Sequence, residues 1–121
     1  MNIWLVCDNP FYSEVLKKLL ENCTKHRITE KMNNGEELIS ALSPSNKTSP
    51  DLILLSLYMD KTSGWEVLDT FKNNSINIPV IIITYSECKQ DLMKTTNYKM
   101  VKGYFHKGNY PAALFDLIDS I

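Results

Sequence analysis

The chain has 121 residues, of which 44% are hydrophobic and 22% charged, and its formal net charge is −1. This balance excludes the broad basic surface typical of nucleic-acid binding, and no apolar run is long enough to cross a bilayer. We therefore expect one globular domain over residues 1–121, cytoplasmic, without a signal peptide, and with three cysteines that remain free thiols.

The first half of the chain predicts two strands and two helices in alternation. We expect a strand at residues 2–7, a helix starting at Pro10, a half-polar edge strand at 27–32, a short helix at 36–42 and a polar loop at 43–50. The side chains predicted to share one face of the first helix are Phe11, Val15, Leu19, Leu20 and Cys23. Those predicted to point inward from the short helix are Leu38, Ala41 and Leu42.

The second half continues the alternation. We expect a fully buried strand at 52–56, a helix at 63–73 opened by a capping-box pattern, and a strong strand at 79–84. A poor helix at 86–95 and a strand at 101–107 follow. A final helix begins at Pro111 and carries apolar residues at the spacing of one helical face, namely Leu114, Leu117, Ile118 and Ile121.

Strands that alternate with helices imply a parallel sheet covered on both faces, and right-handed crossovers make it doubly wound. Five strands suit an α/β fold of the flavodoxin-like type with the strand order 2-1-3-4-5. The functional site of such a sheet lies at the carboxyl ends of its strands. This order predicts one pocket that contains Cys7, Asp8, Ser56, Thr84 and Lys107.

Six stretches in this order and spacing resemble the receiver domain of bacterial two-component response regulators, in a degenerate or pseudo-receiver variant. They are residues 2–8, 34–38, 50–56, 64–68, 79–84 and 102–107. The resemblance implies a phosphate-accepting aspartate at the end of the third strand, and Ser56 occupies that position. It also implies that Tyr104 matches an aromatic residue that swings between outward and inward positions when the switch fires.

The resemblance further implies that Cys7 and Asp8 occupy two acidic Mg²⁺-binding positions, and that Thr84 and Lys107 match residues that bind phosphoryl oxygens. Asp8 and Lys107 leave this pocket with a formal charge near zero, whereas Mg²⁺ favours sites with carboxylate ligands. We expect no cofactor, Mg²⁺ binding that is lost or weak with Asp8 as the residual ligand, and Lys107 close to Asp8 as its counter-charge. Asp60, in the following loop, is expected to be solvated.

A serine hydroxyl is a weak nucleophile unless a base activates it. Because Ser56 stands at the acceptor position, the favoured interpretation is that the domain is a non-enzymatic regulatory module that binds proteins independently of phosphorylation. One alternative is a phosphorylatable receiver that uses a non-standard acceptor. Another is a domain that binds flavin or a small ligand, although residues 7–11 lack the hydroxyl and glycine donors of such phosphate sites.

The resemblance places the partner face on the fourth helix, the last strand and the last helix, around Leu92, Tyr104 and Leu114. The expected partners are proteins: a histidine kinase, an attached or separate effector domain, or a second copy as a homodimer. We expect neither nucleic acid nor a membrane to bind this domain.

Overall fold

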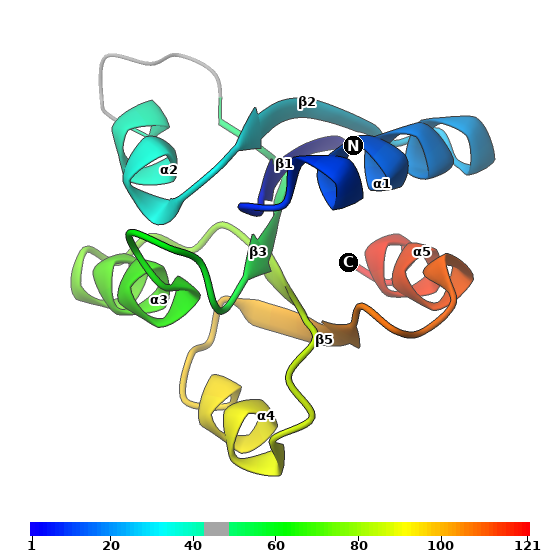
Figure 1. Cartoon of the computed structure of the whole chain (residues 1–121). Helices are drawn as coiled ribbons and strands as arrows, with labels where there is room; N and C mark the ends of the chain where they lie inside the picture. Colours follow the sequence, from blue (N-terminus) through cyan, green and yellow to red (C-terminus); the bar gives the residue numbers. More distant parts are fainter. Residues whose placement is uncertain (43–48) are drawn as a thin grey trace.

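The computed structural model describes residues 1–42 and 49–121, in which strands and helices alternate from one end to the other (Figure 1). The strands are β1 (Asn2–Val6), β2 (Arg27–Met32), β3 (Leu52–Ser56), β4 (Val80–Thr84) and β5 (Val101–His106). The helices are α1 (Pro10–Cys23), α2 (Gly35–Ala41), α3 (Gly64–Asn73), α4 (Lys89–Thr95) and α5 (Pro111–Asp119).

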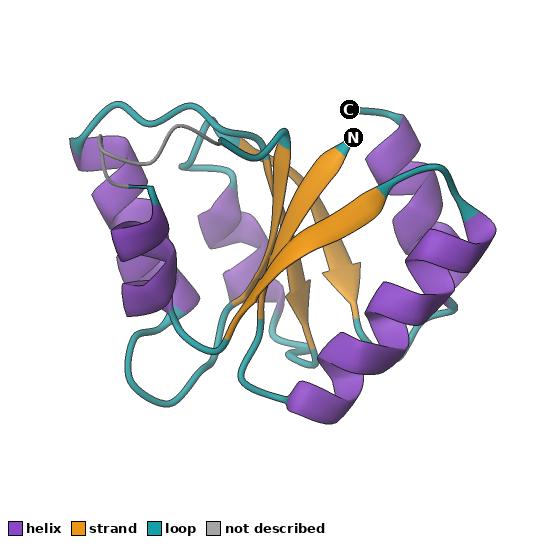
Figure 2. Cartoon of the chain, turned by 90° about the horizontal axis from the view of Figure 1, so that it is seen from above, coloured by secondary structure: helices purple, strands orange, loops and turns teal. Residues whose placement is uncertain are grey.

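The strands form one parallel sheet with the order β2-β1-β3-β4-β5, so the predicted flavodoxin-like topology is confirmed. The half-polar strand β2 lies at an edge of this sheet, as its composition predicts. Helices α1 and α5 cover one face of the sheet, and α2, α3 and α4 cover the other (Figures 1 and 2). None of the helices formed by residues 1–42 and 49–121 has the length and apolar character needed to span a membrane.

Side chains alternate along β1 between the two layers, because successive residues of a strand point to opposite faces. Ile3 and Leu5 join the cluster beneath α1 and α5, whereas Trp4 and Val6 join the cluster beneath α2, α3 and α4. The central strands β3 and β4 are buried along their whole length, as expected for parallel strands covered on both sides.

Polar caps set the starts of three helices. The side chains of Asn9, Asn34 and Ser63 accept hydrogen bonds from backbone N–H groups in the first turns of α1, α2 and α3. The observed boundaries of the strands lie within one residue of the predicted ones. The helix predicted at 86–95 is shorter and begins at Lys89, because the Ser86 hydroxyl accepts from the backbone N–H of Cys88 and holds a turn there. Most of the predicted polar loop, residues 43–48, lies outside the described residues.

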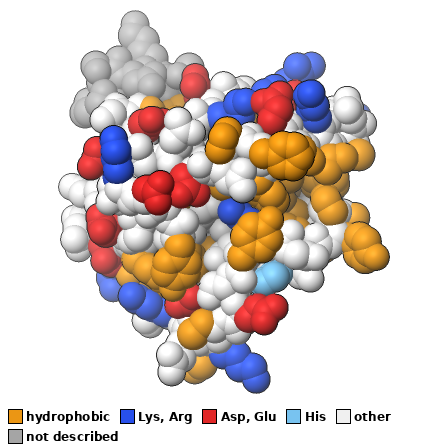
Figure 3. Space-filling model, viewed as in Figure 1, with side chains coloured by type: hydrophobic (Ala, Val, Ile, Leu, Met, Phe, Trp, Pro, Cys, Tyr) orange, Lys and Arg blue, Asp and Glu red, His pale blue; other side chains and the backbone are white. Residues whose placement is uncertain are grey.

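The apolar face predicted for α1 is mostly not the face that packs against the sheet. Phe11, Val15, Leu19 and Cys23 are exposed, and of the five predicted side chains only Leu20 is buried. The buried residues of α1 are Ser13, Leu16 and Leu20. Both sets recur at helical spacing, so periodicity by itself does not decide which of them meets the sheet. The exposed stripe belongs to the hydrophobic surface visible over α1 in Figure 3.

The other helices follow the prediction more closely. Leu38 is fully buried in α2, while Ala41 and Leu42 are partly buried against the same cluster. In α5, Leu114 and Ile118 are buried and Leu117 packs against them, but Ile121 lies beyond the helix and is exposed.

Candidate functional site

The carboxyl ends of β3, β4 and β5 meet around one small cavity. Ser56 ends β3, Thr84 ends β4, and Lys107 follows β5 directly. The backbone N–H of Lys107 donates to the Thr84 carbonyl at 2.7 Å and fixes the end of β5 against β4. The three side chains line a cavity of about 150 Å³. Asp8 does not line it.

Ser56 is 2% exposed, and its hydroxyl oxygen is buried without a hydrogen-bond partner among the residues described here. A buried hydroxyl in this condition costs about 1–3 kcal/mol of stability. The close packing around Ser56 depends on Gly64 at the start of α3, whose N–H donates to the Leu57 carbonyl at 2.6 Å. A Cβ atom on Gly64 would lie 2.8 Å from Leu57 Cα, so a larger residue does not fit there without backbone movement.

Thr84 is also buried, but its hydroxyl has a partner. Oγ1 accepts a hydrogen bond from the backbone N–H of Ser86 at 3.0 Å. This bond shapes the turn between β4 and α4. It uses a lone pair of the threonine oxygen, so the hydroxyl hydrogen of Thr84 remains able to donate toward the cavity.

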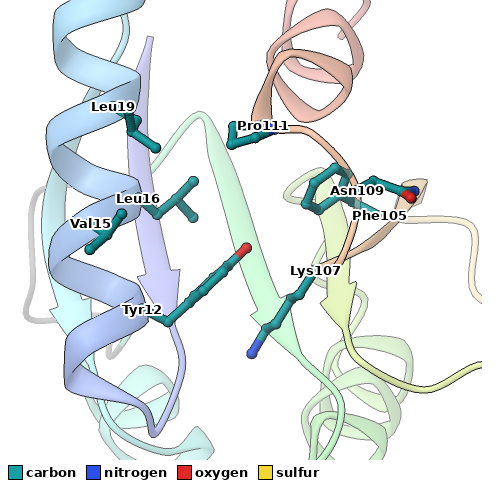
Figure 4. Close-up of a pocket in the computed structure, with 8 residues that line it drawn as sticks. All are labelled: Tyr12, Val15, Leu16, Leu19, Phe105, Lys107, Asn109 and Pro111. Atoms are coloured by element: carbon teal, nitrogen blue, oxygen red, sulfur yellow. The ribbon is translucent and has the colours of Figure 1, made fainter.

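The ammonium group of Lys107 lies among uncharged groups. Its Nζ donates to Cys7 Sγ at 3.4 Å and lies 4.7 Å and 5.2 Å from the ring centroids of Tyr12 and Tyr85. Figure 4 shows the Lys107 side chain extending beside Tyr12 of α1. Burial raises the pKa of the Tyr12 hydroxyl, and Cys7 and Tyr85 add smaller effects, so the ring next to this ammonium is neutral.

The predicted pair between Lys107 and Asp8 is wrong. Within residues 1–42 and 49–121, no carboxylate lies within 4.0 Å of the Lys107 ammonium. Asp8 is exposed to solvent, so hydration stabilises its charge and no buried counter-ion is required. The partial negative charge on the ring faces of Tyr12 and Tyr85 attracts the ammonium instead.

Asp8 lines a second hollow, formed by residues that follow β1, β2 and β3 and by one residue of α2. This hollow has a volume of about 300 Å³, and its lining residues are Asp8, Asn33, Asn34, Glu37, Asp60 and Lys61. Asp60 is exposed. No group of three or more His, Cys, Asp or Glu side chains in the described part of the chain is placed to hold a metal ion. The acidic side chains and Lys107 therefore line separate cavities.

A polar tether connects the loop after β3 to α4. The Tyr58 hydroxyl donates to Asp91 Oδ2 at 2.7 Å, and the Ser86 hydroxyl donates to the same oxygen at 2.6 Å. The Asp91 hydrogen bond raises the pKa of Tyr58. Asp91 therefore joins two loops that border the cavity to one turn of α4.

The residues predicted for a partner face differ in exposure. Leu92 is 47% exposed on α4, and its neighbour Met93 is more exposed still. Tyr104 is half-buried against the cluster beneath α2, α3 and α4, and its buried hydroxyl has no partner among the residues described. Burial raises the pKa of Tyr104, and the negative charge of Asp91 adds to this effect. Leu114 of α5 is fully buried, so its assignment to the partner face is wrong.

Sequence reasoning missed several residues of this region, which are Tyr12, Tyr58, Tyr85, Ser86 and Asp91. Four of them do carry a positional signal. Tyr58, Tyr85 and Ser86 come within two residues of the ends of β3 and β4, and Tyr12 lies in the first turn of the helix after β1. Asp91 carries no such signal, because the fold alone brings α4 next to the loop after β3.

The profile of the response regulator receiver domain matches residues 3–119. The chain belongs to this family. The receiver domain is 27% identical over 121 residues to a nitrate/nitrite response regulator protein homolog of Haemophilus influenzae. It is 30% identical over 118 residues to the transcriptional regulatory protein YdfI of Bacillus subtilis. It spans 56% and 53% of these two proteins, about half the length of each.

Solved structures support the same fold. A DNA-binding response regulator of the LuxR family from Staphylococcus aureus superposes with a TM-score of 0.85 at 21% identity, covering 98% of the receiver domain and 96% of that chain. The phosphorylated cyanobacterial phytochrome response regulator RcpA superposes with a TM-score of 0.78 at 28% identity, covering 98% and 89%. The chain is thus a receiver domain of a two-component response regulator.

Proposed function

We propose that this receiver domain is a pseudo-receiver: a non-enzymatic, cytoplasmic regulatory module that works without phosphorylation of an aspartate. The observation that carries the proposal is Ser56 at the acceptor position, with a buried hydroxyl that has no hydrogen-bond partner among residues 1–42 and 49–121. A serine becomes nucleophilic when a general base within hydrogen-bond reach removes its proton. Thr84 and Lys107, which share its cavity, are not bases at neutral pH.

The arrangement of charges also argues against a resident Mg²⁺ ion. Cys7 is buried, and its sulfur accepts from the Lys107 ammonium, which would repel a divalent cation. Asp8 faces the separate hollow that also contains Asp60. A magnesium ion keeps several waters and is usually bound by one or two carboxylates that converge with other oxygen ligands. The residues present do not fit that requirement, so we infer that the module operates without a metal.

Contacts around α4 support a conformation that is stabilised by interactions within the domain rather than by a phosphoryl group. Asp91 joins Tyr58 and Ser86 to α4, and the Lys94 ammonium lies 4.4 Å from the ring centroid of Trp65 on α3. A two-state domain responds only to a ligand that binds its two states differently. We infer that these contacts maintain one arrangement of α4 in the absence of a phosphoryl group.

Titration with Mg²⁺ and beryllofluoride tests this function. The expected result for the parent protein is no change in Trp65 fluorescence or in the amide shifts of the loop after β3, and no covalent adduct by intact mass after incubation with acetyl phosphate. The matched variant Cys7→Asp/Ser56→Asp should recover Mg²⁺ binding, because carboxylates then replace the Cys7 thiol next to Lys107 and the Ser56 hydroxyl in the cavity. Mg²⁺ binding by the parent as tight as by this variant, or a phosphoryl adduct on the parent, refutes the proposal.

For the partner surface we propose the exposed side of α4, centred on Leu92 and Met93, and an effector domain as its occupant. Receiver domains typically interact with histidine kinases and effector domains, and the curated relatives extend to about twice the matched length. When an effector domain is added, amide exchange of Leu92 and Met93 should become slower than in residues 1–121 by themselves. Equal amide exchange in the two samples contradicts an effector domain as the occupant. A dimer that Leu92→Ser abolishes and Phe11→Ser does not would show that a second copy of this chain binds the surface instead.

A further inference from the structure

A hollow of about 340 Å³ lies at the opposite end of the sheet, beside the amino ends of β4 and β5. One wall is the end of α3 with the turn that follows it, and the other is the turn between α4 and β5. The buried side chains of Phe71 and Met100 form its apolar part. The other lining residues are polar and exposed, namely Lys72, Ser75, Asn77, Asn97 and Lys99. None of them lines the cavity of Ser56 or the hollow of Asp8.

The charges around this hollow are all positive. Lys72 and Lys99 line it and no carboxylate does, and neither lysine belongs to an ion pair within residues 1–42 and 49–121. Residues 70–86 and 92–115, which include the whole lining, contain no Asp or Glu, although the chain has 14 acidic residues. The acidic residue nearest to Lys72 in the sequence is Asp69, which accepts from the Tyr98 hydroxyl at 2.6 Å and does not line the hollow. A bound anion therefore meets two positive charges and no negative one.

The neutral donors of the lining are not used within the domain. In the described part of the chain, the hydroxyl of Ser75 and the side-chain amides of Asn77 and Asn97 make no hydrogen bond. By contrast, Asn74 does not line the hollow, and its side chain donates to the Thr70 carbonyl at 2.8 Å. These hydroxyl and amide groups leave three uncommitted side chains that can donate to one ligand.

The carbonyl oxygens at the end of α3 do not compete for these donors. The carbonyls of Phe71 and Lys72 accept from the backbone N–H groups of Ile76 and Ser75 at 2.8 Å and 3.4 Å. Ser75 makes this closure possible with a φ of 55°, a left-handed conformation that is usual for glycine at the end of a helix. No other non-glycine residue in the described ranges adopts a positive φ.

We propose that this hollow binds a small organic phosphate monoester of about the size of a mononucleotide. A phosphate monoester carries about 1.5 to 2 negative charges at pH 7, which matches the two ammonium groups of Lys72 and Lys99. The body of the ligand packs on Phe71 and Met100, and about 340 Å³ lies within the usual range for a small-molecule site. The bound ligand joins the end of α3 to the turn after α4. This site does not depend on the pseudo-receiver function, because it shares no residue with the cavity of Ser56.

The test is a titration with AMP and with ribose 5-phosphate, followed by amide chemical shifts at constant ionic strength and without Mg²⁺. Saturable shifts at residues 72–77 and 97–100 with either ester support the site. We expect adenosine to produce none and inorganic phosphate to bind at least tenfold more weakly than AMP. The absence of saturable shifts at these residues with both esters overturns the proposal. Binding of inorganic phosphate or succinate as tight as that of AMP also overturns it, because the ligand class is then wrong.

Variants of the two lysines measure the contribution of charge. Lys72→Met and Lys99→Met should each weaken AMP binding by about tenfold, because a charge-assisted hydrogen bond is lost. The matched control Lys102→Met removes an exposed lysine of β5 that does not line the hollow, so the affinity should be unchanged. Equal weakening by all three variants would show that general surface charge attracts the ligand and would overturn the site.

Ser75→Gly separates binding from folding. Glycine adopts a positive φ without strain, so this variant should raise Tm in the absence of ligand. It also removes the Ser75 hydroxyl, so AMP should bind about threefold to tenfold more weakly. A loss of affinity in a stabilised protein cannot come from misfolding. An affinity that stays unchanged in Ser75→Gly, Lys72→Met and Lys99→Met contradicts the site.

Intact mass distinguishes this proposal from the pseudo-receiver function. A covalent phosphoryl adduct after treatment with acetyl phosphate refutes the pseudo-receiver function, and saturable shifts with AMP would still support the hollow as a site. Unchanged mass together with no saturable shifts from either ester refutes the site and leaves the pseudo-receiver function standing.

Discussion

Replacement of Ser56 by alanine should stabilise this receiver domain, although most substitutions of buried residues destabilise. The hydroxyl of Ser56 is buried and has no hydrogen-bond partner among the residues described, and removing an unpaired buried hydroxyl recovers about 1–2 kcal/mol. For a chain of 121 residues the unfolding entropy is about 0.25 kcal/mol per kelvin, so 1 kcal/mol corresponds to about 4 °C in Tm. We expect Ser56→Ala to raise Tm by about 4–8 °C.

The matched control is Thr84→Val at the end of the neighbouring strand. Valine has nearly the shape of threonine, but it leaves the backbone N–H of Ser86 without the acceptor that Thr84 Oγ1 provides. This variant should lose about 1 kcal/mol, and its Tm should fall by about 4 °C. Opposite signs for the two substitutions are the signature of one unpaired and one paired hydroxyl.

Both variants are measured by thermal and urea unfolding in buffer that lacks phosphate and sulfate. The buffer matters because a ligand that binds only the folded state raises Tm. If Ser56→Ala lowers Tm as much as Thr84→Val does, the Ser56 hydroxyl has a stabilising partner and the reasoning is refuted.

Three further predictions concern single positions. Asp91→Asn should speed amide hydrogen exchange in α4 without unfolding the sheet, because an amide oxygen accepts the hydrogen bonds from Tyr58 and Ser86 more weakly than a carboxylate does. Unchanged exchange in α4 would contradict the role of Asp91 as a tether. Gly64→Ala should lower the free energy of unfolding in urea by about 3 kcal/mol or more, because the added Cβ atom would meet the backbone of Leu57. In the control Gly108→Ala the added Cβ atom meets only a histidine side chain, so the loss of stability should be much smaller. Burial, aided by a hydrogen bond to a carboxylate of α3, raises the pKa of Tyr98 from about 10 to about 12. The neutral Tyr98 hydroxyl therefore contributes to the free energy of unfolding below pH 10, and this contribution is lost as the pH rises toward 12. Tyr98→Phe should make the free energy of unfolding fall less steeply between pH 10 and pH 12. An unchanged slope would be inconsistent with the raised pKa.

The elements and their order could be predicted because they depend on local chemistry. The apolar run at Leu52–Ser56 and the caps at Asn9 and Ser63 act within a few residues, and both cap side chains accept hydrogen bonds from backbone N–H groups. Alternation of strands and helices then restricts the sheet to very few topologies. The same alternation predicted that Ser56 and Lys107 lie close together at the carboxyl ends of the strands, and both line one cavity there.

Sequence by itself thus determined the fold, the order of strands and helices, and the absence of a carboxylate at position 56. Only the tertiary structure decided which face of α1 is buried and which groups surround Lys107. Helical periodicity is the same for Leu16 and for Val15, and the choice between them depends on how α1 lies against the sheet. Likewise, formal charge suggested Asp8 as the partner of Lys107, but hydration of an exposed carboxylate and the nearby rings of Tyr12 and Tyr85 are properties of the packed molecule.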